Sequence, residues 1–210
     1  MTEQLDRWRG AFGDEYTERN QVNYTTRLRA WQVMLEGLML YSALEIGANR
    51  GANLEAIVKT WPTFIRLDGI EPNLQAAGGA FHRPLSEHLY IRSQDGVRYA
   101  TLDDLQESGT YDLVFTCGVL IHVPPEELDK ALRQIYRLSR RYILAIEYYA
   151  EQETMIPYRG MDNMLWKRNY EQEYLRRYGG SQLHTIRSGF WTKADGFDDC
   201  HWWLMEKITP

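Results

Sequence analysis

The chain has 210 residues, with 24 Lys and Arg against 29 Asp and Glu, which gives a formal net charge of −5 at pH 7. Hydrophobic residues at 44% and charged residues at 25% are ordinary globular values and argue against wholesale disorder. The acidic balance argues against a nucleic-acid partner, because such proteins need a basic face. It leaves room for a small acidic substrate held by a few local Arg or Lys residues.

The cysteines and the first residues of the chain bear on its compartment. Cys117 and Cys200 are too few for a disulfide framework, which fits a reducing compartment. The first six residues lack the basic start and apolar run of a signal peptide. The most apolar stretch, residues 33–47, is too short and too charged to span a bilayer. We therefore expect a soluble cytoplasmic protein without a membrane partner.

The predicted elements begin with helices over residues 1–38, which are followed by alternating strands and helices. A nearly continuous apolar run at residues 41–46 predicts a strand buried on both faces. Residues 53–61 then carry apolar side chains at helical spacing, and Pro62 ends that helix. The next strands are predicted at residues 64–70, 88–91 and 111–116.

The second half of the chain continues the alternation. A helix begins near Pro125, where acidic residues favour a helix N-terminus, and a fifth strand follows at residues 142–146. A helix is predicted around residues 164–178, and the last two strands are predicted at residues 183–191 and 201–208. Because no convincing helix separates these last two strands, we expect them to form an antiparallel hairpin.

This alternation indicates an α/β fold, with a mostly parallel sheet covered by helices on both faces. No internal repeat, low-complexity tract or linker divides the chain. We therefore expect one domain over residues 1–210, in which a helical cap at residues 1–38 precedes an α/β core at residues 39–210.

The segment after the first predicted strand is where an open parallel sheet binds its ligand. Gly47 and Gly51 permit a tight turn and a close approach of a ligand to the backbone, and Asn49 between them tolerates left-handed backbone angles. Glu71 ends the second strand 24 positions after Gly47. That spacing suits a carboxylate that accepts hydrogen bonds from the ribose hydroxyls of a nucleoside ligand.

The residues around this turn favour S-adenosylmethionine over a nicotinamide dinucleotide. The G-x-G-x-x-G fingerprint, which a pyrophosphate needs, is absent from residues 47–54. Glu45, at the tip of the first strand, would repel a pyrophosphate but could orient an ammonium group. The alternative is that the glycines only make a turn and that Glu45 and Glu71 are solvated strand ends.

Six segments of the chain resemble class I S-adenosylmethionine-dependent methyltransferases, and more narrowly the methylases associated with pseudaminic acid biosynthesis. They are residues 12–20 (FGDEYTERN), 45–54 (EIGANRGANL), 111–122 (YDLVFTCGVLIH), 147–149 (EYY), 158–160 (YRG) and 167–168 (KR). The resemblance implies a Rossmann-like methyltransferase fold and methyl transfer to a small molecule. The implied acceptor is a nonulosonate sugar or a nucleotide-sugar intermediate.

The resemblance and the spacing together assign candidate cofactor residues. Those of the first two strand ends are Glu45, Gly47, Asn49, Gly51, Asn53, Glu71 and Pro72. The class pattern implies adenine contacts by Ser93, Gln94 or Asp95, and contacts to the methionyl part by Cys117 and Gly118.

The candidate acceptor residues follow the fourth and fifth strands. His122 is the candidate catalytic base, since its ordinary pKa lies near neutral pH; the alternative is a residue that caps the next helix or fills a core gap. The candidate substrate-binding residues are Glu147, Tyr148, Tyr149, Tyr158, Arg159, Lys167 and Arg168. Tyrosine rings can surround a cation or stack on a ring, and an Arg fork can bind a carboxylate or phosphate. Aromatic packing and a solvated run of surface charge are the alternatives.

Other functions remain open at this level. No histidine cluster has metal-ligand spacing, so no metal is expected. An NAD(P)-dependent oxidoreductase or epimerase would need a phosphate-binding glycine set and usually a Tyr-x-x-x-Lys pair, neither of which occurs. A non-catalytic module that binds S-adenosylmethionine stays an alternative, because the family pattern is not kept at Asn169 and is poorly matched over residues 93–110. The sequence leaves the oligomeric state unknown.

Overall fold

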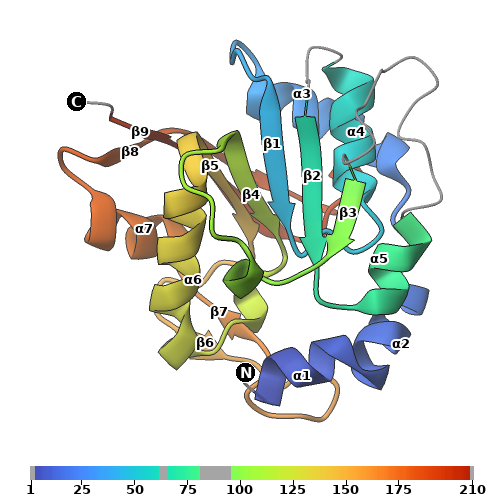
Figure 1. Cartoon of the computed structure of the whole chain (residues 1–210). Helices are drawn as coiled ribbons and strands as arrows, with labels where there is room; N and C mark the ends of the chain where they lie inside the picture. The colour runs from blue at the N-terminus through green and yellow to red at the C-terminus, as the bar shows by residue number, and fades with distance from the viewer. Residues whose placement is uncertain (1–2, 62–65, 81–95, 209–210) are drawn as a thin grey trace. The chain divides into compact units, whose positions relative to one another are not determined.

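The computed structural model describes residues 3–61, 66–80 and 96–208 (Figure 1). Within it the chain divides into two compact units, Met1–Gln106 and Glu107–Pro210, called here the N-terminal and C-terminal units. The expectation of one domain with a boundary near residue 38 stays a prediction.

The N-terminal unit begins with the predicted helical segment. Its elements are α1 (Glu3–Arg9), α2 (Ala11–Arg19), the 3-10 turn η1 (Tyr24–Arg27) and α3 (Leu28–Leu35). The ring of Trp8 lies edge-on to the rings of Phe12 and Tyr16, at 5.0 and 5.1 Å between centroids. Gly13 allows the close packing of α2 on α1, because a Cβ there would lie 1.9 Å from the carbonyl oxygen of Trp8. The predicted N-terminal helical segment is therefore confirmed.

The same unit continues as a three-stranded parallel sheet with helices. Its elements are β1 (Ser42–Ile46), α4 (Ala52–Thr60), β2 (Arg66–Glu71), α5 (Leu74–Ala80), β3 (Gly96–Tyr99) and the 3-10 turn η2 (Leu102–Asp104). The strands lie in the order β3-β2-β1. Every residue of β1 is buried, as its apolar run predicts, and α4 turns Leu54, Ile57 and Val58 inward.

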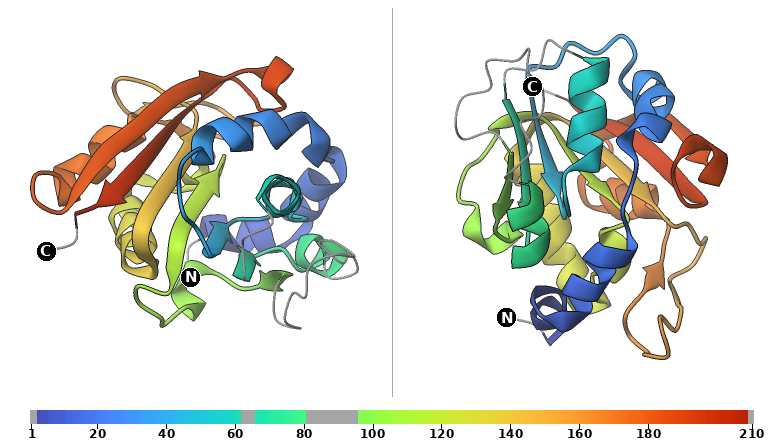
Figure 2. Two further views of the ribbon diagram at one scale, coloured as in Figure 1. Left: turned by 90° about the horizontal axis from the view of Figure 1, so that it is seen from above. Right: turned by 90° about the vertical axis from the view of Figure 1, so that its right-hand side faces the viewer.

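The C-terminal unit adds a second group of strands. Its elements are β4 (Tyr111–Cys117), the 3-10 turn η3 (Leu120–His122), α6 (Pro125–Leu138), β5 (Ser139–Glu147), β6 (Thr154–Met155), β7 (Trp166–Lys167), α7 (Tyr170–Tyr178), β8 (Leu183–Trp191), the 3-10 turn η4 (Lys193–Asp195) and β9 (Cys200–Lys207). β4 and β5 are parallel, whereas β9 runs antiparallel to β5 and β8 antiparallel to β9. The long hairpin of β8 and β9 is visible in Figure 2.

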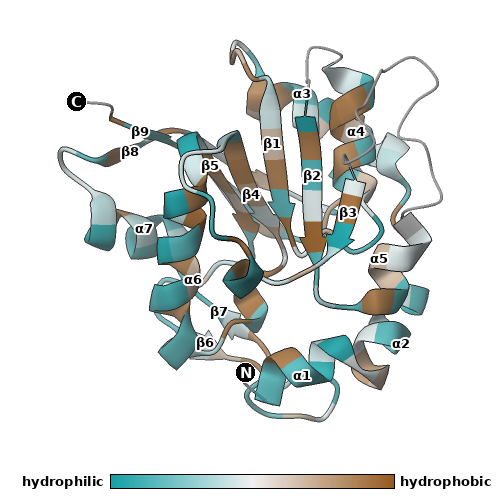
Figure 3. Ribbon diagram, in the orientation of Figure 1, coloured by the Kyte–Doolittle hydropathy of each residue, from teal (hydrophilic) through white to brown (hydrophobic). Residues whose placement is uncertain are grey.

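The apolar stripe of α6 explains how this helix packs. Leu128, Leu132 and Ile135 lie three or four positions apart and are buried, with Leu138 one turn further on. Figure 3 shows hydrophilic and apolar residues on different sides of α6. Together the two units have the predicted fold class: a mostly parallel sheet with helices, a C-terminal antiparallel hairpin and an N-terminal helical segment.

The third strand and the start of α7 differ from the predicted elements. The strand predicted at 88–91 lies outside the described residues, and the third strand of the N-terminal unit is β3, which we did not predict. β3 has four residues and only Val97 is buried among them, so it carries no periodic signal. The helix predicted around 164–178 begins at Tyr170, because the Asn169 side chain caps it by accepting from Gln172 N at 3.0 Å. No helix in the three described ranges has the length and apolar character needed to cross a bilayer.

Candidate functional site

The loop after β1 adopts the left-handed conformation that its sequence suggests. The φ angles of Gly47, Asn49 and Gly51 are 68°, 47° and 79°. Gly47 N and Ala48 N both donate to the carbonyl oxygen of Ile70, at 2.8 and 3.0 Å, which lays the loop against the end of β2. The backbone of residues 47–51 therefore forms a tight turn between β1 and α4.

Gly69 makes room for this turn, and we did not single it out from the sequence. A Cβ at Gly69 would lie 2.6 Å from the Cβ of Ala48 and 3.1 Å from a methyl group of Leu54. A glycine inside a strand often marks such a close approach, and that signal was available in the sequence.

Glu45 lies buried beside the turn, at 2% exposure. Asn53 Nδ2 donates to Glu45 Oε1 at 2.6 Å, and Arg27 Nη1 donates to Asn53 Oδ1 at 2.7 Å. Within the described residues, Glu45 Oε2 has no hydrogen-bond partner. Burial raises the pKa of Glu45 to about 8, against the hydrogen bond from Asn53 and the charge of Arg27, which lower it, while Glu71 adds to the rise. This leaves a buried carboxyl oxygen with unused hydrogen-bonding capacity.

Glu71 is also buried, at 7% exposure. Its Oε2 accepts from Asn49 N at 2.8 Å and its Oε1 accepts from Asn73 N at 2.9 Å. Burial raises the pKa of Glu71, and the two amide donors oppose that rise. Both glutamates are thus buried, which rules out the alternative of solvated strand ends.

Asn73 ties the N-terminal helices to the end of β2. Its Nδ2 donates to Asp14 Oδ1 at 2.7 Å and lies 3.3 Å from the carbonyl oxygen of Trp8, while its Oδ1 accepts from Ala76 N at 2.8 Å. Pro72, next to it, is half-buried. Arg27 and Asn73 were not predicted, because Asn53 and Asp14, which they contact, lie 26 and 59 positions away in the chain.

The predicted adenine contacts Ser93, Gln94 and Asp95 lie outside the described residues. The predicted methionyl contacts are described: Cys117 is half-buried at the end of β4, and Gly118 follows with a φ of 65°.

In the C-terminal unit, residues 118–123 form a loop between β4 and α6, called here the η3 loop. Glu147, at the end of β5, is fully buried and accepts from the backbone N–H groups of this loop. Burial raises the pKa of Glu147 to about 7, and the amide donors oppose that rise.

His122 is the last residue of η3. Its Nδ1 lies 2.7 Å from the carbonyl oxygen of Met164. Because a carbonyl only accepts hydrogen bonds, Nδ1 carries the proton of the neutral ring and Nε2 holds the lone pair. Burial lowers the pKa of His122 to about 4, against a smaller opposite effect of the carbonyl. The N-cap residue of α6 is Pro124, which makes no side-chain cap hydrogen bond.

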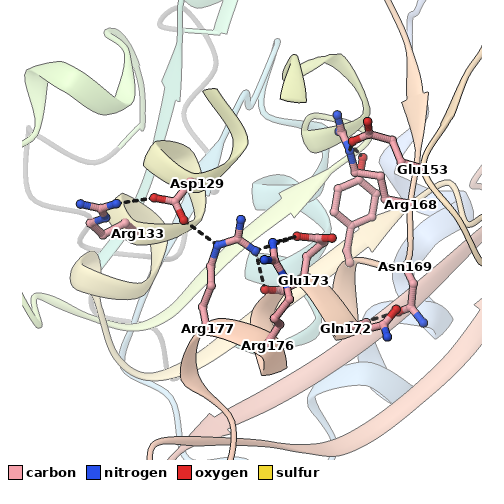
Figure 4. Close-up of polar contacts among 10 residues, drawn as sticks. Asp129, Arg133, Glu153, Arg168, Asn169, Gln172, Glu173, Arg176 and Arg177 are labelled. Atoms are coloured by element: carbon pink, nitrogen blue, oxygen red, sulfur yellow. Dashed lines mark hydrogen bonds and ion pairs between the residues drawn. The ribbon is translucent and has the colours of Figure 1, made fainter. Parts of the chain in front are cut away.

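The predicted cations near β7 differ in their surroundings. Arg168 is 1% exposed, and its Nε donates to Glu153 Oε2 at 2.6 Å (Figure 4). Arg159 is exposed, with its guanidinium 5.9 Å from the ring centre of Tyr158. Lys167 is half-buried, with Nζ 5.7 Å from the ring centre of Tyr148.

The predicted tyrosines each have a described contact. Tyr158 lies with its ring 5.5 Å from that of His122, and Tyr148 Oη donates to Asp198 Oδ2 at 2.8 Å. Tyr149 is 37% exposed and lies 4.6 Å from the ring of His201 in β9. The structure therefore brings Tyr158 to His122 and Lys167 to Tyr148, while Glu147 and Arg168 turn into the protein.

Comparison with known proteins covers both the turn after β1 and the η3 loop. Residues 44–141, which hold the turn after β1, Glu71 and the η3 loop, match the family model of a methyltransferase domain. The matched stretch is a little under half of the chain. No curated protein sequence matches the chain significantly. Among its described residues, no group of three or more His, Cys, Asp or Glu could hold a metal ion.

Solved structures that are similar to this chain have low sequence identity to it. The magnesium protoporphyrin IX methyltransferase from Synechocystis, solved with bound S-adenosylmethionine, is 16% identical, with a TM-score of 0.66 and 98% of each chain covered. The 1,6-didemethyltoxoflavin N1-methyltransferase from Burkholderia thailandensis, solved with 1,6-didemethyltoxoflavin and S-adenosylhomocysteine, is 15% identical. Its TM-score is 0.72, with 99% of this chain and 90% of that chain covered.

These comparisons confirm the coarser predictions. The fold is that of class I methyltransferases, residues 44–141 match the family model of a methyltransferase domain, and the two neighbours were solved with S-adenosylmethionine or S-adenosylhomocysteine bound. The narrower likeness to pseudaminic acid-associated methylases stays a prediction.

Proposed function

We propose that this protein transfers a methyl group from S-adenosylmethionine to a small-molecule acceptor. The observation that carries the proposal is the pair of buried carboxylates beside the left-handed turn. Glu45 Oε2 has no described hydrogen-bond partner, and both oxygens of Glu71 are oriented by backbone N–H groups. A buried polar atom without a partner is costly, so a ligand that donates a hydrogen bond to Glu45 would stabilise the site.

The residues present fit this cofactor. S-Adenosylmethionine, when bound, supplies an activated methyl group on a cationic sulfur. Glu45 would accept from its ammonium group, and Glu71 would accept from the ribose hydroxyls through lone pairs that its backbone contacts leave over. A dinucleotide fits less well, because the extra glycines are missing and a pyrophosphate carries no hydrogen-bond donor for Glu45 Oε2.

His122 would act on the acceptor. Its Nε2 holds the lone pair at neutral pH, so it can accept a hydrogen bond from an acceptor O–H or N–H group. A pKa of about 4 makes His122 a weak base, since general bases work best when their pKa lies near the working pH. Its proposed role is therefore to orient the acceptor and to take the proton as it leaves during methyl transfer.

The acceptor we propose is an acidic sugar, of the nonulosonate or nucleotide-sugar type. The resemblance in the sequence supports it, together with two cations that are not fully buried, Arg159 and Lys167. Arg159 is the better candidate for a carboxylate or phosphate, because its fork can form two parallel hydrogen bonds.

The test is a screen of purified sugar intermediates with methyl-labelled S-adenosylmethionine. The proposal predicts label in an acidic sugar or nucleotide sugar, and none with His122→Ala and Glu45→Ala combined. Label only in a neutral flat heterocycle would contradict the sugar acceptor. Binding of S-adenosylhomocysteine without any transfer would favour the non-catalytic module, and binding of NAD instead would favour an oxidoreductase.

A further inference from the structure

The η3 loop carries His122 and has few hydrogen bonds of its own. Within η3 and its flanks, His122 N donates to Val119 O at 2.9 Å and Val123 N donates to Leu120 O at 3.1 Å. A helix of one turn leaves most of its N–H and C=O groups without partners inside the helix. Leu120 and Ile121 are buried, so other parts of the chain must supply those partners.

Glu147 supplies hydrogen-bond partners at the amino end of the η3 loop. Its carboxylate accepts from Val119 N at 3.2 Å, from Leu120 N at 3.1 Å and from Ile121 N at 3.4 Å. Three consecutive N–H groups therefore converge on one side chain that is 0% exposed.

Arg168 supplies hydrogen-bond partners at the carboxyl end of the η3 loop. Its Nη1 donates to Val123 O at 3.0 Å and lies 3.3 Å from Leu120 O. The ion pair of Nε with Glu153, drawn in Figure 4, fixes the guanidinium from its other side.

The two charges have the signs that a short helix prefers. A helix terminus with free N–H groups favours a negative charge, and one with free C=O groups favours a positive charge. Burying two ionisable groups is costly, and apolar residues would fill the same space at a lower cost. What apolar residues cannot do is fix the backbone of the η3 loop at both ends.

The ring of His122 is held by the same segment that carries Arg168. Met164, whose carbonyl oxygen lies 2.7 Å from His122 Nδ1, is four positions before Arg168 in the chain. The backbone position and the ring orientation of His122 therefore both depend on residues 164–168.

We propose that Glu147 and Arg168 are positioning residues that hold the η3 loop from both ends and so orient His122. This role replaces the acceptor contact that the sequence suggested for them, and it rests on the proposed function of His122.

The first test needs no acceptor. Two-bond ¹H–¹⁵N correlation spectra report the tautomer of His122, assigned by the signal that His122→Ala removes. We expect one Nδ1–H tautomer in the unsubstituted protein and averaged tautomer shifts in Glu147→Gln and in Arg168→Met. Arg168→Lys, which keeps a donor, should restore part of the original signal. An unchanged tautomer in both folded variants would overturn the proposal.

Arg177→Lys is the matched control. Arg177 pairs with Asp129 on α6 and with Glu173 on α7 (Figure 4). None of these three residues belongs to the η3 loop. We expect this variant to leave the His122 signals unchanged, and a comparable change there would overturn the assignment to the loop contacts.

The second test uses the acceptor that the labelled-methyl screen identifies. Arg168→Met should lower kcat at least tenfold, with the acceptor KM and the affinity for S-adenosylhomocysteine within twofold. Added to His122→Ala, the same substitution should change kcat less than twofold, because residues that act through one another are not additive. A raised acceptor KM with unchanged kcat, or additive effects, would overturn the proposal. If no acceptor is found, the proposed function fails while the tautomer spectra still decide the positioning role.

Discussion

Cofactor binding should be coupled to the release of a proton from Glu45. Its pKa of about 8 means that most of the carboxyl groups carry a proton at neutral pH. A bound ammonium group favours the ionised form, so binding should release up to one proton and strengthen with pH, by up to about tenfold per pH unit below pH 8. Calorimetry with S-adenosylhomocysteine in buffers of different ionisation enthalpy measures this release. Glu45→Gln should abolish it, whereas the exposed Glu151→Gln should keep it, and equal release in all three proteins would contradict the assignment.

His122 should make the protein less stable in acid. Its pKa is about 4 in the folded protein and near 6.5 in the unfolded chain, so the unfolded chain binds more protons between these pH values. The contribution of His122 to the free energy of unfolding should therefore fall by about 2 kcal/mol as the pH drops from 6.5 towards 4, after allowance for its partial exposure. Urea unfolding of His122→Gln should show the variant gaining about this amount of stability relative to the unsubstituted protein over this window. A difference between the two proteins that does not change with pH would contradict the lowered pKa.

The carboxyl groups of Glu45 and Glu147 change the stability with pH in the opposite direction to His122. Their folded pKa values, about 8 and about 7, lie above the ordinary value of 4.5, so the folded protein binds more protons above pH 4.5. Their contribution to stability is present at pH 4.5 and below and is lost as the pH rises through 7 to 8. The two effects together place the pH of maximum stability on the acid side of neutrality.

At the scale of elements, the turn after β1 depends on a glycine in the neighbouring strand. Gly69→Ala would place a Cβ 2.6 Å from that of Ala48, so we expect a loss of about 1–3 kcal/mol and weaker binding of S-adenosylhomocysteine. Gly78→Ala is the matched control, because no atom of the described residues outside the backbone of its own helix lies within 4 Å of its added Cβ, and alanine favours the helix α5. Thermal unfolding and calorimetry compare the two. Equal effects of both substitutions would contradict the packing described for the turn.

The elements also show how far the sequence alone predicts this protein. Long apolar runs and the turn residues at 47–51 carry local signals, so the turn was predicted, β1 and β4 were predicted within one residue and β5 within three. β3 has one buried residue in four and carries no such signal. The segment 164–169 begins with three consecutive apolar residues, which do not tell a helix from a strand, and only the pairing of β6 with β7 and the cap by Asn169 show that it is not helical.

The candidate site was predicted in part for the same reason. Glu45, Asn49 and Glu71 stand at strand ends that the sequence reveals. The contacts that orient them come from far along the chain, as with Arg27 on Asn53, and no local pattern predicts these. Glu147 and Arg168 were predicted as site residues from a family resemblance, which does not reveal that their polar atoms face the η3 loop.

At the scale of the whole molecule, the net charge of −5 opposes an anionic acceptor. Local cations must therefore attract it, and Arg159 is the exposed candidate. Arg159→Gln should raise the KM for an acidic sugar about fivefold, or about 1 kcal/mol, with kcat and cofactor affinity unchanged. A neutral ester of the same sugar is the control, and its KM should not change. A fall in kcat with unchanged KM for the acid would contradict this role.

The central claim is that the two buried carboxylates of the N-terminal unit hold the nucleoside cofactor. A crystal structure of the full chain with S-adenosylhomocysteine tests it most directly. We predict the ammonium group within hydrogen-bonding distance of Glu45 Oε2 and the ribose hydroxyls on the carboxylate of Glu71. Cofactor bound elsewhere, or bound at this turn without contact to either carboxylate, would contradict the account.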